Sequence, residues 1–109
     1  MKDTSVAKRY AHALFNVSVA RGTVDITASE LFQLKSFSDK DKAFIGFLVA
    51  PQVLTEHKQA IIRTLFTTRL SPQLLSFLYL LIEKGRIDML GEIAREFETY
   101  LEHHKGIIK

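Results

Sequence analysis

The chain has 109 residues, of which 47% are hydrophobic and 25% charged, a balance that suits one compact domain. Its net charge of +3 comes from basic residues scattered along the sequence, which gives little support for a nucleic-acid groove. There is no cysteine, so disulfides and thiolate metal sites are excluded. No apolar run has the length of a transmembrane helix, and the N-terminus lacks the hydrophobic core of a signal peptide. Strand-like alternation is almost absent, which predicts an all-α fold.

The first helix is predicted from Ser5 to Arg21, and Gly22 is expected to end it in the left-handed conformation that glycine tolerates. Its apolar residues form two adjacent stripes, one with Val6, Tyr10, Ala13 and Val17, the other with Ala7, Ala11, Leu14 and Phe15. Two stripes imply two contact partners. Either both stripes pack inside the domain, or one of them receives another chain.

A second helix is predicted from Val24 to Phe37. Its apolar spacing is satisfied by Leu34 or by Phe32, and the sequence leaves both open. Ser38, with Asp41 three residues later, resembles a capping box in which Asp replaces the usual Glu or Gln. This pair predicts that a new helix begins at this point.

The third helix is predicted to begin at this cap, and the fourth has a cap of its own. The third is predicted from Asp39 to about Val49, because Pro51 disfavours helical backbone at the residue before it. Thr55 is predicted to cap the fourth. The expected buried residues are Phe44, Ile45, Phe47 and Leu48 in the third helix and Ile61, Ile62, Leu65 and Phe66 in the fourth.

The fifth helix lies between two clear boundary signals. Ser71 is a suitable N-cap before Pro72 at the first helical position, and Gly85 suits the helix end. One broad apolar arc contains Leu74, Leu75, Leu78, Leu81 and Ile82; Phe77 lies at its edge and Leu80 outside it. The helix is apolar on more sides than one contact requires. It either has neighbours on most sides or turns part of its surface to a partner.

The last helix is predicted from Ile87 to about His104 and is expected to end near Gly106. One face carries Leu90, Ile93, Ala94, Phe97, Tyr100 and Leu101, and charged residues occupy the other. The connections are short, as in an antiparallel bundle. We therefore predict an all-α fold, a single compact bundle of six helices. Its core is expected to contain Leu14, Phe66, Leu78, Ile82, Leu90, Ile93 and Phe97.

Signals of catalysis are poor. The glycines are scattered, so there is no phosphate-binding loop, and there is no HExxH motif. His103 and His104 are adjacent and diverge by about 100° on a helix, so they cannot share a metal ion. His12 and His57 are isolated in the sequence. We predict no catalytic residue, no metal and no cofactor.

Four segments carry a family resemblance: VAKRYAHALFNVSVARG, LVAPQVLTEHKQAII, LSFLYLLIEKGRI and LGEIAREFETYL. Taken in this order, they resemble the N-terminal domain of the delta subunit of F-type ATP synthases, which is the oligomycin-sensitivity-conferring protein in mitochondria. The resemblance spans nearly the whole chain. It implies a six-helix bundle without catalytic activity that holds the peripheral stalk, or stator, to the catalytic head of the ATP-synthesising complex.

The resemblance also implies a binding site for the amphipathic N-terminal helix of an alpha subunit, in a groove between the first and fifth helices. By position within the motifs, the groove residues are Tyr10, Ala13, Val17, Phe77, Leu80 and Leu81. The residues at its flanks are Val6, Leu14, Gln73 and Lys84.

Residues 1–105 are expected to form this domain, and residues 106–109, with Ile107 and Ile108, to begin a connection to a C-terminal region. In the family, that region contacts the b subunit of the stalk. The implied location is the cytoplasmic face of the bacterial inner membrane, within the ATP synthase complex and without insertion into the bilayer.

One alternative is a helical nucleic-acid-binding regulatory domain, with Thr55 to Arg69 as the recognition helix. Its cations would be Lys58, Arg63 and Arg69, which are too dispersed for a good phosphate footprint. A small helical enzyme is a third class, for which the sequence shows no catalytic constellation.

Overall fold

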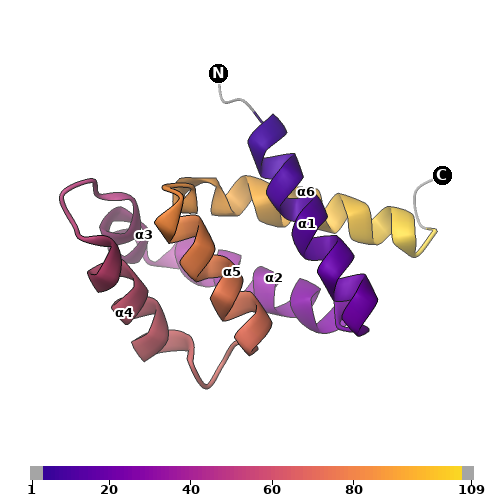
Figure 1. Ribbon diagram of the computed structural model, residues 1–109, viewed down its shortest axis with the longest axis horizontal. Helices are drawn as coiled ribbons and strands as arrows, with labels where there is room; N and C mark the ends of the chain where they lie inside the picture. The colour runs from indigo at the N-terminus through magenta and orange to yellow at the C-terminus, as the bar shows by residue number, and fades with distance from the viewer. Residues whose placement is uncertain (1–3, 107–109) are drawn as a thin grey trace. The chain divides into compact units, whose positions relative to one another are not determined.

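The computed structural model describes residues 4–106, which form six α-helices, one short 3-10 helix and no strand (Figure 1). The predicted all-α class and the six helices are confirmed. The described residues fall into two compact units. Unit 1 contains residues 4–35 and 89–106, and unit 2 contains residues 36–88. None of the helices within residues 4–106 combines the length and apolar character needed to cross a membrane. Ile107 and Ile108 lie outside the described residues.

Helix α1 (Ser5–Arg21) has the predicted bounds. Gly22 has a positive φ of 69°, a conformation that costs glycine little and other residues more. In this turn, the backbone N–H of Gly22 donates to the carbonyl of Val19, and the N–H of Thr23 donates to that of Ser18. These hydrogen bonds satisfy carbonyls that the end of the helix leaves open. The chain thereby enters the next helix after two residues.

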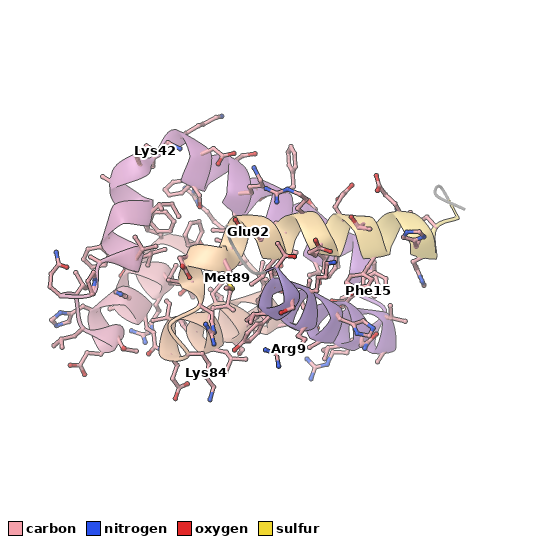
Figure 2. The ribbon with its side chains drawn as sticks, turned by 90° about the horizontal axis from the view of Figure 1, so that it is seen from above. Arg9, Phe15, Lys42, Lys84, Met89 and Glu92 are labelled. Atoms are coloured by element: carbon pink, nitrogen blue, oxygen red, sulfur yellow. The ribbon has the colours of Figure 1, made fainter. Side chains whose placement is uncertain are left out.

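The core of unit 1 lies where α1 packs along α6 (Leu90–His104). Figure 1 shows α1 crossing α6, and Figure 2 shows Phe15 between the two helices and Arg9 on the outer side of α1. The Phe15 ring meets the Phe97 ring edge to face, with centroids 5.4 Å apart. The stripe of α1 that is buried here contains Ala7, Ala11, Leu14 and Phe15.

Helix α2 (Val24–Lys40) contributes its first part to unit 1, and from Ser36 onward it belongs to unit 2. Leu31 and Leu34 are buried, whereas Phe32 is 72% exposed. The choice between Leu34 and Phe32 that the sequence leaves open is therefore decided in favour of Leu34.

The capping box predicted at Ser38 and Asp41 is wrong. Helix α2 continues to Lys40, and α3 (Lys42–Val49) begins later than predicted, with Asp41 as its N-cap. The Asp41 carboxylate accepts a hydrogen bond of 3.0 Å from the backbone N–H of Phe44. Ser38 instead lies inside α2, where its hydroxyl is buried and has no hydrogen-bond partner among the described residues.

The predicted cap of α4 is also shifted by one residue. Helix α4 (Thr55–Phe66) has Leu54 at its N-cap, with extended backbone and no side-chain cap, so Thr55 is the first helical residue. An N-cap needs the non-helical backbone that the chain has at Leu54. In α5 (Pro72–Glu83) the prediction holds, because the Ser71 hydroxyl accepts from the N–H of Leu74 and Pro72 occupies the first turn.

In unit 2, α4 and α5 lie side by side (Figure 1). The Gln59 side-chain amide donates a hydrogen bond of 3.2 Å to the backbone carbonyl of Tyr79. One turn later, the Arg63 guanidinium lies 5.9 Å from the centre of the Tyr79 ring, within the range of a cation–π contact. An edge-to-face cluster of Phe37, Phe44 and Phe66 fills another part of this unit. Polar contacts thus supplement apolar burial between the helices.

The last predicted helix begins differently from the prediction. Residues Ile87–Met89 form a single 3-10 turn, η1, before α6 starts at Leu90. The end of α6 agrees with the prediction, since Gly106 has a φ of 74°. All seven residues predicted for the core are buried: Leu14, Phe66, Leu78, Ile82, Leu90, Ile93 and Phe97.

Candidate functional site

Helix α1 has a second apolar stripe, which lies beside the buried stripe and contains no buried residue. We call Val6, Tyr10, Ala13 and Val17 the α1 flank. These residues follow one another at i, i+4, i+7 and i+11, so they share one side of the helix. Val6 and Tyr10 are half-buried, Ala13 is exposed, and Val17 is 42% exposed. A stripe with this spacing offers the anchor pattern that a second helix needs.

One side of α5 carries residues at the same spacing. We call Gln73, Phe77, Leu80 and Lys84 the α5 flank. Phe77 is buried at 8% exposure, Gln73 is half-buried, and Leu80 and Lys84 are exposed, Leu80 to 39%. Leu80 therefore provides the largest apolar surface on this flank. The α1 flank belongs to unit 1 and the α5 flank to unit 2.

Three residues of the predicted groove and its flanks are buried. Leu81 is fully buried and lies on the core side of α5. Leu14, which is predicted at the edge of the groove, is also buried. It belongs to the stripe of α1 that contains Phe15. Leu81 follows Leu78 by three positions and Leu74 by seven, so all three share the core side of α5. Phe77 is only 8% exposed, so it contributes little accessible surface to the predicted groove.

Two of the exposed apolar residues outside the flanks, Val19 and Leu65, are useful for comparison. Val19 on α1 is 42% exposed, as Val17 is, but lies two residues on and therefore on a different side of the helix. Leu65 on α4, predicted to be buried, is 36% exposed, close to the value for Leu80. Each residue matches a flank residue in chemistry and exposure while lying elsewhere on the surface. They are natural controls for any test of the flanks.

Two of the four histidines, His12 and His104, take part in aromatic contacts. The His12 ring stacks on Tyr100 with centroids 5.1 Å apart, and the His104 ring meets Phe15 edge to face at 5.5 Å. Within residues 4–106, no three side chains of His, Asp or Glu gather in a group that could hold a metal ion.

The cations of the alternative recognition helix do not share a face. Arg63 lies five residues after Lys58, which places it roughly 140° away around α4, and it is engaged with Tyr79. Arg69 lies beyond Phe66, where α4 ends. A helix that binds in a DNA groove presents its cations along one side, and α4 does not have this arrangement.

Comparison with known proteins identifies a family. The sequence model of the ATP synthase delta (OSCP) subunit family matches residues 6–109. The chain is 37% identical over 107 residues to ATP synthase subunit delta of Bacillus pumilus, covering 98% of this chain and 59% of that protein. It is 33% identical over 102 residues to ATP synthase subunit delta of Clostridium kluyveri, covering 93% of this chain and 56% of that protein.

The chain thus spans less than two-thirds of the length of these relatives. The match includes all six helices, since it begins within α1 and continues beyond α6. The chain belongs to the ATP synthase delta (OSCP) subunit family.

Proposed function

We propose that this chain forms the N-terminal part of a non-catalytic peripheral-stalk subunit of an F-type ATP synthase. Its task is to bind the amphipathic N-terminal helix of an alpha subunit and so to hold the catalytic head to the stator during proton-driven ATP synthesis. The family supports the setting, and the two flanks support helix binding. In this proposal, contact with the b subunit belongs to the C-terminal region of the subunit.

The observation that carries this proposal is the α1 flank. Its four residues keep helical spacing over three turns, yet none is buried, although the stripe beside it is fully used in unit 1. Ala13, in the middle of the flank, has a small side chain that allows another helix to approach closely. On α5, Leu80 supplies an exposed apolar anchor with the same spacing relative to its neighbours. A partner helix lying along either flank would remove the apolar surface of that flank from water.

In the assembled complex, the subunit lies at the membrane through its association with the stalk, with no segment of this chain inserted in the bilayer. It needs no cofactor. Catalysis belongs to the head, so the isolated chain should neither bind nor hydrolyse ATP. Saturable binding of ATP at micromolar concentration, measured by calorimetry, would contradict this part of the proposal.

The direct test is titration with a synthetic peptide of the alpha-subunit N-terminus from the same genome. Val17→Asp on α1 and Leu80→Asp on α5 each place a charge on a flank. Each should weaken binding by about tenfold or more, or roughly 1.4 kcal/mol, because the bound helix would cover an unpaired carboxylate.

Matched controls are Val19→Asp and Leu65→Asp, which change side chains of the same type and nearly the same exposure away from the flanks. They should bind the peptide as the unchanged chain does. Melting curves for all four variants show whether the fold is intact. Equal loss of binding in flank and control variants, or no loss in any, would be evidence against the flanks as the contact surface.

A further inference from the structure

Helix α4 carries a further row of residues at the spacing that the two flanks have. We call Leu54, Lys58, Ile61 and Leu65 the α4 stripe, because they follow one another at i, i+4, i+7 and i+11. Leu54 is the N-cap, and its carbonyl accepts a hydrogen bond of 3.1 Å from the N–H of Lys58, so it stands one turn before that residue. Leu54 is 56% exposed and Leu65 36%, while Lys58 and Ile61 are half-buried. All four residues belong to unit 2.

The α4 stripe is not on the side of α4 that packs against α5. That side is marked by the Gln59 amide and the Arg63 guanidinium, which both contact Tyr79 of α5. Each of them lies two positions before a residue of the stripe, which places it roughly 160° away around the helix. A lone exposed leucine is ordinary on a protein surface. A row of apolar residues at anchor spacing, turned away from the neighbouring helix, is the pattern on which a second helix docks.

The stripe is positively charged, and no acidic residue lies near it on the helix. Lys58 forms no ion pair within residues 4–106. The residues beside it on this side of α4, His57 and Thr64, carry no negative charge. Glu56 is the single acidic residue in the segment 42–82, and it stands two positions before Lys58, roughly 160° around α4. The cations of the same segment are Lys42, Lys58, Arg63 and Arg69.

We infer that the α4 stripe is a second docking surface of this chain, and that its partner is an amphipathic helix with a carboxylate that pairs with Lys58. Apolar anchors of that helix meet Leu54 on one side of the ion pair and Ile61 and Leu65 on the other. The expected partner pattern is therefore apolar, acidic, apolar and apolar at i, i+4, i+7 and i+11. A basic partner is disfavoured, because it would cover the Lys58 ammonium without pairing it.

This surface is separate from the two flanks and does not depend on the function proposed for them. A simpler role for Lys58 is to cover apolar surface of its own helix with its aliphatic stem. In that role, substitution of Lys58 would change the melting temperature, and the chain would show no preference for the charge of a peptide. The charge preference of binding therefore separates the two roles.

The probe is a designed helical peptide of about four turns, with leucines at i, i+7 and i+11 and glutamate at i+4. A matched peptide has lysine at i+4. Calorimetric titration of the whole chain should show saturable binding of the glutamate peptide and about tenfold weaker binding of the lysine peptide. In Lys58→Glu this preference should reverse. The amide NMR shifts caused by the glutamate peptide should gather along α4.

Two variants outside the stripe serve as controls. Leu65→Asp should weaken binding of the glutamate peptide by about tenfold or more. Leu80→Asp, on the α5 flank and at nearly the same exposure, should leave that binding unchanged. Lys84→Glu makes the same change of charge as Lys58→Glu but lies at the end of α5, so the preference for glutamate should persist. Melting curves show whether each variant is folded.

Three results would overturn the inference. Absence of saturable binding of the glutamate peptide up to about 1 mM would show that the stripe does not dock a helix of this chemistry. An unchanged preference in Lys58→Glu would remove the ion pair. Equal losses in Leu65→Asp and Leu80→Asp would mean that the peptide adheres to any exposed leucine. The proposed function stands or falls separately, on the alpha-subunit peptide and Val17→Asp.

Discussion

The hydroxyl of Ser18 on α1 lies 3.1 Å from the hydroxyl of Thr27 on α2, and the two are hydrogen bonded and fully buried. Ser18 also hydrogen bonds to the carbonyl of Leu14 at 2.8 Å. Buried polar groups are tolerated when they are paired in this way. The contact joins two helices across the short turn at Gly22 and is a polar element in the otherwise apolar core of unit 1.

Removing either hydroxyl should destabilise the chain. Ser18→Ala and Thr27→Val should each lower the free energy of unfolding by about 1 kcal/mol, the usual net value of a protein hydrogen bond. Because the two side chains share one hydrogen bond, the double variant should lose less than the sum of the single variants. Urea unfolding of the four proteins measures this. Strict additivity would show that the hydroxyls do not interact in solution.

Ser38→Ala should stabilise the chain. The Ser38 hydroxyl is buried without a partner among the described residues, and serine is a weaker helix former than alanine. We expect the free energy of unfolding to rise by about 1 kcal/mol. Ser36→Ala, two residues earlier in α2, provides the control, since it changes helix propensity at a half-buried position. A loss of stability in Ser38→Ala would reveal a hydrogen bond of this hydroxyl in solution.

Ile93→Ala tests the core of α6. Ile93 is fully buried, so the substitution removes apolar contacts and leaves a cavity. The expected cost is about 2–5 kcal/mol. Glu98→Ala, on the exposed side of the same helix, should change stability by less than about 0.5 kcal/mol. Chemical unfolding monitored by circular dichroism suits both, and a small effect at Ile93 would contradict its place in the core.

Leu80→Asp and Leu81→Asp test the boundary between flank and core on α5. Leu80 is exposed and Leu81 is fully buried, although the two are adjacent. A carboxylate at position 81 would be buried without a partner, so we expect a loss of about 4 kcal/mol or more, enough to unfold many small domains. Leu80→Asp should cost about 1 kcal/mol and leave the fold intact. Similar melting temperatures for the two variants would mean that this boundary is misplaced.

Much of the fold could be predicted because its helix boundaries are encoded locally. Gly22 specifies a helix end through its backbone conformation, and the pair Ser71–Pro72 specifies a helix start through a side-chain cap and the fixed φ of proline; the structure has both where the sequence predicts them. At Ser38 and Asp41 the local signals compete, because either side chain can cap a helix. Caps differ by about 1 kcal/mol, which burial of neighbouring residues easily exceeds. The structure chooses Asp41 and leaves Ser38 buried inside α2.

The candidate site was only partly predictable. Helical periodicity and the family resemblance disagree at Leu81, since the periodicity assigns it to the apolar arc with Leu74 and Leu78 and the resemblance to the groove. Its complete burial agrees with the periodicity. Phe32 and Leu34 show where periodicity fails as a guide. Both satisfy the apolar spacing, and which of them is buried depends on the neighbouring helices. Sequence spacing gives the direction of a side chain, whereas its exposure is decided by what lies opposite.

The contact of α1 with α6 has a consequence for the order in which the protein folds during synthesis. Phe15 and Phe97 are far apart in the chain, so the core of unit 1 cannot close until α6 has left the ribosome. Unit 2 consists of one continuous segment, residues 36–88, and its contacts need none of the later residues. Nascent chains arrested when residue 88 has left the ribosome and α6 has not should therefore protect α4 and α5 from proteases, while α1 remains cleavable until α6 has emerged.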